Sequence, residues 1–325
     1  MGPIFILGNS RSGTTLLRLM LTCHENISIP PEGPFFFFLE PKYHDVSDIN
    51  SKVIEDFISE LFSVPKMDEW NLDKQRLFER LNNTPVESFI DLINGVHKEY
   101  MISSGKIKNR WGDKSGSYSI RFINSIKRSL PNAHLVNIIR DGRDVACSYR
   151  SLYGTKGKYA PNFPTNIIEI ALQWRSNVSR INDFLDKWPR DQQTIVKYED
   201  LVSNPTKSLQ NLCDDIDEVF DVNMLNFHNL NSKFELEPKK YLSWKQKTLE
   251  AVSVSQVERW KSELSDEDVS LFEYIAGDTL IYYGYAVESK NNKINLKDRL
   301  EVGILSINQY IRQSGTFVKS MITNN

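Results

Sequence analysis

The sequence predicts an α/β fold with a parallel sheet, on three observations. Short apolar runs alternate with helix-like segments along the chain, which is the usual pattern of a parallel sheet flanked by helices. The first apolar run, residues 3–7, meets a turn rich in Gly and Ser and then a helix-like segment. The chain has 325 residues, of which 40% are hydrophobic, so it can bury one sizeable core.

The individual elements follow from apolar spacing and from punctuation by Pro, Asn and Gly. Residues 153–166, rich in Gly, Lys, Tyr and Pro, predict a mobile loop. We expect strands or extended segments at 3–7, 26–29, 134–139 and 194–197, and helices at 14–23, 53–62, 86–103, 119–130, 143–152, 167–188 and 205–214.

The domain organisation predicted is one domain over residues 1–288 and a tail over 289–325. The tail opens with a polar linker, after which Leu300, Ile304, Ile307 and Ile311 recur at helical spacing. The linker and the tail lack a dense basic face, so membrane contact is not expected. We expect the tail helix to pack on the domain or on a second subunit, as in a homodimer.

Charge and cysteine content exclude several classes of protein. The 40 Lys and Arg and 42 Asp and Glu residues give a net charge of −2, so no global basic field attracts nucleic acid or an anionic membrane. The three cysteines are widely spaced and lack metal-ligand spacing, which indicates reduced thiols. The run at 4–7 is too short for a signal peptide and no stretch approaches ~20 apolar residues. We therefore expect a cytoplasmic protein.

The turn after the first strand predicts a phosphate site. Gly8 ends the strand and Gly13 allows close approach of a ligand, while the leading amides and the positive dipole end of the next helix attract an anion. A nucleotide kinase would have Lys where this chain has Thr14, so a kinase is disfavoured. The candidate phosphate-binding residues are Ser10, Arg11, Ser12, Gly13, Thr14 and Thr15.

A second candidate anion site follows the apolar run 134–139. The strand would deliver Arg140 to the carboxyl edge of the sheet, where open α/β sheets bind ligands, and Ser148 would follow on the next helix. Arg offers a forked donor and Ser a hydroxyl to a phosphate. The alternative is an ordinary charged cluster at a strand end, and for Arg143 and Asp144 we favour that alternative, as a structural ion pair.

These two motifs resemble those of sulfotransferases that use 3′-phosphoadenosine 5′-phosphosulfate (PAPS). Arg11-Ser12-Gly13-Thr14-Thr15 is similar to their 5′-phosphosulfate loop, and residues 134–148 are similar to their 3′-phosphate motif, particularly in the branch of the tyrosylprotein sulfotransferases. The resemblance implies a P-loop-like fold and transfer of a sulfuryl group from PAPS to a hydroxyl, or an amine, without a metal. The product would be 3′,5′-ADP. The acceptor could be a small molecule, a glycan or a peptide.

The same resemblance implies three further site residues. Glu32 matches a general base, because a carboxylate can accept the proton of an acceptor hydroxyl. Lys114, in Trp-Gly-Asp-Lys, matches a cation beside the leaving oxygen, and Tyr198 matches a Tyr near the nucleotide. The alternatives are a surface Glu in a Pro-rich loop, a solvated Lys and a Tyr that packs at a strand end. His24 could replace Glu32 as base, although capping of the preceding helix suits it better.

Several features stay open at the level of sequence. Phe35 to Phe38 could wall an acceptor pocket or belong to the core. Arg259-Trp260 match a family pair that follows the segment closing over the nucleotide, but the Lys of that segment does not align, although Lys245 and Lys247 lie nearby. A P-loop kinase and a non-catalytic nucleotide-binding protein are the two alternatives to a sulfotransferase.

Overall fold

A central parallel sheet organises the protein, as the sequence predicts. The computed structural model describes residues 1–105, 107–116, 120, 123–288 and 294–308. The sheet has the order β2-β3-β1-β4-β5 with every neighbouring pair parallel. The carboxyl ends of the strands therefore share one edge. The strands are β1 (Ile4–Leu7), β2 (Ile27–Ser28), β3 (Arg110–Asp113), β4 (His134–Ile139) and β5 (Gln193–Lys197).

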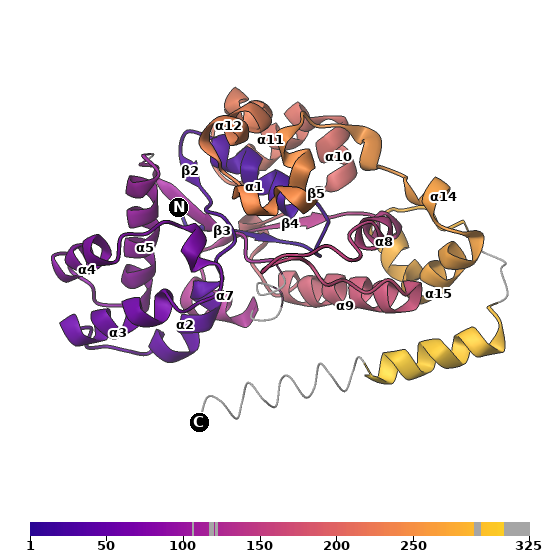
Figure 1. Ribbon diagram of the computed structural model, residues 1–325, viewed down its shortest axis with the longest axis horizontal. Helices are drawn as coiled ribbons and strands as arrows, with labels where there is room; N and C mark the ends of the chain where they lie inside the picture. The colour runs from indigo at the N-terminus through magenta and orange to yellow at the C-terminus, as the bar shows by residue number, and fades with distance from the viewer. Residues whose placement is uncertain (106, 117–119, 121–122, 289–293, 309–325) are drawn as a thin grey trace.

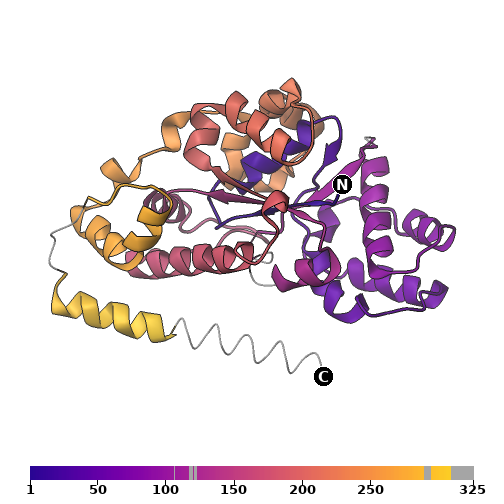
Figure 2. The same cartoon turned by 180° about the vertical axis from the view of Figure 1, so that it is seen from behind.

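Helices cover both faces of the sheet, and a helical lobe extends beyond its β2–β3 side (Figures 1 and 2). One face carries α1 (Thr14–Cys23), α10 (Tyr198–Ser203), α11 (Pro205–Asp215) and α12 (Phe227–Phe234). The other face carries α8 (Gly142–Arg150), α9 (Ile167–Leu185) and α15 (Asp266–Tyr282). The lobe contains α2 (Phe35–Tyr43), α3 (Ser51–Leu61), α4 (Lys74–Asn82), α5 (Phe89–Ser103) and α7 (Ile123–Ser129).

Short helical turns link these layers, and most of them lie in the last third of the domain. They are η1 (Met67–Glu69), η2 (Arg190–Gln192), η3 (Val222–Asn226), η4 (Lys239–Tyr241), α13 (Leu242–Lys245), η5 (Gln246–Leu249), η6 (Val254–Gln256) and α14 (Trp260–Glu263).

Alternation along β1 divides the core between the two faces. Ile4 and Ile6 pack in the cluster that contains α1 and α11, whereas Phe5 packs with the lobe. Burying both faces of a strand in this way stabilises the fold by about 25 cal/mol for each Å² of apolar surface removed from water. Three of the four consecutive phenylalanines belong to this core, since Phe35–Phe37 are fully buried and Phe38 is 43% exposed.

The strand β3 is missing from the sequence-based expectation. Its four residues, Arg-Trp-Gly-Asp, include two charged side chains and no apolar run, so periodicity does not reveal a strand. Pairing with β1 and β2 makes the segment a strand. The other predicted strands occur within one or two residues of their expected bounds, and the start of the helix expected at 119–130 lies partly outside the described residues.

The tail packs on the domain, but not through the side chains expected. Residues 296–308 are helical, and Val302 and Leu305 pack against the cluster formed by α8, α9 and α15. Leu300, Ile304 and Ile307 are 60%, 59% and 62% exposed, so these residues of the predicted stripe do not pack on the domain, and their packing on a second subunit stays a prediction. Ile311 and the linker 289–293 lie outside the described residues.

Candidate active site

The loop between β1 and α1 is wound so that the first amides of α1 open onto a cavity. Ser12 N donates to Asn9 O at 3.1 Å, and Arg11 and Gly13 have left-handed φ angles of 67° and 96°. A Cβ at Gly13 would lie 2.6 Å from the Tyr198 ring, so only glycine fits this close contact. The positive end of the α1 dipole and its unpaired amides suit an anion at this point.

The two sequence motifs meet directly. Arg140, at the end of β4, donates to Arg11 O at 3.1 Å, and Arg11 Nε donates to Ser148 Oγ on α8 at 3.0 Å. The Arg140 guanidinium also lies 4.5 Å from the centre of the Tyr198 ring. The parallel register of β1 and β4 places both strand ends at the same edge and so brings together residues 129 positions apart.

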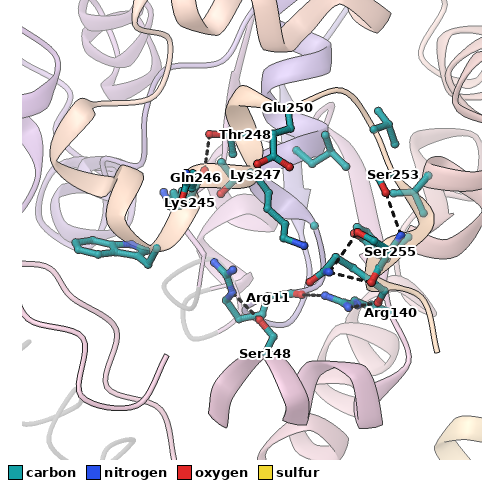
Figure 3. Close-up of a pocket in the computed structure, with 18 of the residues that line it drawn as sticks. Arg11, Arg140, Ser148, Lys245, Gln246, Lys247, Thr248, Glu250, Ser253 and Ser255 are labelled. Carbon is teal, nitrogen blue, oxygen red and sulfur yellow. Dashed lines mark hydrogen bonds between the residues drawn. The ribbon is translucent and has the colours of Figure 1, made fainter. Parts of the chain in front are cut away.

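These residues line a cavity of about 630 Å³ (Figure 3). Arg140 Nε is buried without a hydrogen-bond partner among the described residues, and such a group is costly unless a ligand or water satisfies it. Burial and the nearby Arg140 lower the pKa of Arg11 to about 10, so Arg11 stays protonated at neutral pH. Of the predicted residues, Arg11, Gly13, Thr14, Thr15, Arg140, Ser148 and Tyr198 line the cavity, whereas Ser10 and Ser12 are not among its lining residues.

The segment 243–259 completes the cavity wall. It is the segment in which the sequence leaves the closing Lys unassigned. Lys245, Lys247 and Arg259 all line the cavity. Lys247 extends from η5 towards Arg140 and Arg11 (Figure 3), and burial together with Arg259 and Arg140 lowers the pKa of its ammonium group.

Arg143 and Asp144 both make structural contacts, but the ion pair between them that the sequence predicts does not form. Arg143 makes a two-pronged pair with Asp141, pairs with Glu273 and lies 3.7 Å from the centre of the Trp260 ring. Asp144 accepts from two backbone amides, those of residues 258 and 260 at 2.9 and 3.0 Å, and so holds the segment that follows η6. The helical turn after Gly142 points the two side chains of this motif in different directions.

Glu32 lies outside this cavity, in a cluster of lysines. Its Oε2 accepts from Lys114 Nζ at 3.0 Å and its Oε1 accepts from Lys66 Nζ at 2.8 Å. Burial alone would raise the pKa of Glu32, but Lys114 and Lys66 hold it well below its usual range. The structure thus brings Glu32 together with Lys114, neither of which lines the cavity that contains Arg11, and adds Lys66, for which the sequence holds no recognisable motif.

A chain of charges links Glu32 to the cavity. Lys245 lines the cavity, and its positive charge helps to lower the pKa of Glu32. Lys245 also forms an ion pair with Glu237, which in turn pairs with Arg18 at 2.5 Å. Burial lowers the pKa of Lys245 to about 8, with Glu237 opposing that effect. Arg18 lies on α1 within a helical apolar pattern, so only the tertiary structure reveals its role.

His24 takes another role than the one predicted from the sequence. It ends α1, but its ring bonds to Val219 O at 2.8 Å and accepts from Asn26 N at 3.0 Å, so the ring does not cap the last carbonyls of the helix. Both ring nitrogens are therefore engaged in holding the turn between α1 and β2.

Strand ends, a helix N-terminus and several cations converge on one cavity in this P-loop-like α/β protein. Residues 3–221 match the model of the Sulfotransferase family, and the chain therefore belongs to that family. A Caenorhabditis briggsae protein described as "Putative protein-tyrosine sulfotransferase" is 22% identical over 227 residues, which are 70% of this chain and 69% of the relative.

Solved structures show the same fold. A sulfotransferase domain from the curacin biosynthetic pathway is 20% identical, with a TM-score of 0.58, over 88% of this chain and 99% of that domain. A sulfotransferase domain from the Synechococcus PCC 7002 olefin synthase is 24% identical, with a TM-score of 0.53, over 84% of this chain and 94% of that domain. The protein is accordingly a transferase of sulfuryl groups, and nothing in these comparisons favours a kinase.

Proposed function

We propose that the protein transfers the sulfuryl group of PAPS to a hydroxyl acceptor and releases 3′,5′-ADP. The observation that carries this proposal is the buried Arg140 Nε, which has no hydrogen-bond partner among the described residues, at a cavity that also receives the N-terminus of α1. A nucleotide with phosphates on both its 5′ and 3′ carbons would supply two anions to this one cavity. Arg11 with the α1 amides suits the first, and Arg140, Ser148 and Lys247 suit the second.

PAPS supplies the activated sulfuryl group, and the protein's own residues position the reactants and stabilise the charge that develops. Arg11 and the first amides of α1 would stabilise negative charge that develops on the leaving phosphate oxygen. Glu32 would take the proton of the acceptor hydroxyl, and Lys114, paired with Glu32, would orient that carboxylate and face the same reaction centre. The cations are fixed by burial before the reaction, so little reorganisation is needed when charge develops.

Calorimetry that compares the affinity for 3′,5′-ADP with the affinity for 5′-AMP tests the proposal. We expect 3′,5′-ADP to bind at least about a hundredfold more tightly, because 5′-AMP would leave Arg140 and Lys247 without an anion. Equal affinities, or a preference for ATP with Mg²⁺, would overturn the proposal. A non-catalytic nucleotide-binding protein would show the same preference, but would consume no PAPS with any acceptor.

Three finer points also belong to this proposal. We propose that transfer needs no metal, which titration with a chelator tests; the described residues contain no cluster of three or more His, Cys, Asp or Glu placed to hold a metal ion. A cytoplasmic location suits a chain with three widely spaced cysteines. Within the described residues no helix has the length and apolar character of a membrane span. A homodimer would cover the outward face of the helix at 296–308.

A further inference from the structure

Glu32 is paired with two cations in this structure, although its proposed role requires an appreciable affinity for protons. Each of its oxygens accepts from an ammonium group, at 2.8 Å from Lys66 and 3.0 Å from Lys114. A carboxylate held by two cations is a weak base. The charged or titratable groups that act on Glu32, or on which it acts, come from three segments and include Lys66, Asp113 with Lys114, and Tyr241 with Lys245.

The two lysines that contact Glu32 differ in how firmly they are held. Lys114 follows β3 directly and its side chain is 4% exposed, whereas the side chain of Lys66 is 19% exposed. Lys66 also lies on the connection between α3 and η1 with a left-handed φ of 71°, a conformation that costs a residue with a side chain about 1 kcal/mol or more. Lys66 is therefore the cation that can leave Glu32.

A clasp of surface contacts holds Lys66 in place. We define the clasp as residues 66–69 together with Tyr159, Lys240 and Tyr241. Tyr159 Oη accepts from Lys66 N at 3.2 Å, Lys240 pairs with both Asp68 and Glu69, and Tyr241 donates to Glu69 at 2.8 Å. The ion pair of Lys240 with Asp68 is about half exposed and contributes only about 0–1 kcal/mol, whereas the Glu69 side chain is buried and its contacts with Lys240 and Tyr241 hold η1 in place.

Space for a ligand adjoins the clasp. A second cavity, of about 710 Å³, is lined by Asp68, Glu69 and Lys240 of the clasp and by Pro31, the residue that precedes Glu32. Trp70 and Tyr100 also line this cavity and provide aromatic surface. Neither Lys66 nor Glu32 lines this cavity, so an acceptor that binds here would contact the clasp and Pro31, and its hydroxyl would extend beyond the cavity to reach Glu32.

We propose that Lys66 determines acceptor specificity: it masks Glu32 until an anionic group on the acceptor, a carboxylate or a phosphate, takes Lys66 as its partner. An ammonium group that leaves one carboxylate in a partly buried place needs another anion, because an unpaired charge there is costly. A neutral alcohol supplies no such group and leaves Glu32 paired. The acceptor class is thus a hydroxyl compound that carries a nearby anionic group and an aromatic or apolar body. This inference rests on the proposed sulfuryl transfer.

The first test uses water as the acceptor, so it needs no knowledge of the natural substrate. In hydrolysis the oxygen of water bonds to sulfur, the bond from sulfur to the 5′-phosphate oxygen breaks, and Glu32 takes the proton of water. We expect Lys66→Met to hydrolyse PAPS about tenfold faster than the wild type, because its Glu32 is a stronger base. Lys66→Arg, which keeps the cation, should behave like the wild type.

The matched control is Lys158→Met. Lys158 pairs with Asp68 at the surface and its side chain is 71% exposed, but it does not contact Glu32. This variant removes a lysine from the same neighbourhood and should hydrolyse PAPS at the wild-type rate. Thermal unfolding and 3′,5′-ADP affinity of each variant report whether it is folded. Hydrolysis by Lys66→Met that is no faster than that of the wild type overturns the inference.

The second test measures binding rather than turnover. Calorimetry compares 3-(4-hydroxyphenyl)propanoate with 4-ethylphenol, titrated into the complex of the protein with 3′,5′-ADP. We expect the acid to bind about tenfold more tightly to the wild type and to Lys158→Met, and this preference to vanish in Lys66→Met. Absence of a preference in the wild type counts against the inference. Failure of the wild type to bind 3′,5′-ADP would instead overturn the proposed function.

Discussion

The nucleotide cavity and the Glu32 cluster are both rich in cations, but their charges are balanced differently. Around the cavity, Arg11 and Lys247 have no carboxylate within ion-pair distance among the described residues, and the pair of Arg140 with Asp144 is long, at 3.9 Å. Around Glu32, each lysine is paired, Lys66 and Lys114 with Glu32 and Lys245 with Glu237. The cavity is thus prepared for an anion, whereas the cluster must give up a partner before it acts.

This difference has a structural origin. Arg140 and Arg11, two cations of the cavity, extend from a strand end and a tight loop, which backbone pairing in the sheet holds in place whether or not a ligand is present. The Glu32 cluster depends on the connection at residues 66–69 and on segment 238–245, which are linked mainly by side chains. Rigid elements hold a site ready, whereas side-chain contacts between loops can exchange partners.

Removal of the Glu32 carboxylate should have the largest effect and should separate the two regions. We expect Glu32→Gln to lower the single-turnover rate of transfer from bound PAPS by about 10²–10⁴. Its affinity for 3′,5′-ADP should stay within a few-fold of the wild type, because Glu32 does not line the cavity. A near-wild-type rate across pH would show that the acceptor proton goes elsewhere, to a base on the acceptor.

The next largest effect should come from Arg143, in the same motif as Arg140 but outside the cavity lining. Arg143→Met removes the partner of two buried carboxylates, those of Asp141 and Glu273, and should lower the free energy of unfolding by about 3–5 kcal/mol. Denaturant unfolding measures this change. A loss below about 1 kcal/mol would mean that the buried network is not structural.

Arg140→Met, in contrast, should change nucleotide affinity more than the free energy of unfolding. Loss of a fork that faces the cavity should weaken 3′,5′-ADP binding by about 10–100-fold and leave 5′-AMP binding nearly unchanged. Calorimetry with both nucleotides provides the comparison. An equal loss for the two nucleotides would place Arg140 at the 5′-phosphate and exchange the two anion positions of our proposal.

The smallest effect concerns pH and tests the role of Lys245, which lines the cavity and also acts on Glu32. The pKa of Lys245 is lowered to about 8 by burial, so its positive charge is present below pH 8 and is lost as the pH rises above it. Affinity for 3′,5′-ADP should therefore fall several-fold between pH 7 and pH 9. Titration of Lys245→Met should give a flatter profile, and an identical slope would contradict this role.

The sequence was sufficient to predict the residues that local backbone geometry brings together. The run from Pro3 to Thr15 predicts a strand from its apolar residues, then a turn rich in Gly and Ser and a helix start, and the proposed anion site follows because a helix N-terminus presents free amides. Arg140 and Ser148 could be predicted in the same way, because a strand end and the next helix are adjacent in the chain.

The tertiary structure decided which distant charges meet. Nothing local distinguishes Lys66 from other surface lysines, and its contact with Glu32 exists because η1 packs beside the residue pair Pro31-Glu32, where Trp70 donates to Pro31 O at 3.0 Å. The strand β3, the outward face of the tail helix and the closing segment at 243–259 likewise depend on neighbours far along the chain. Periodicity reports whether a face is apolar, but the packing of other elements determines which partner covers that face.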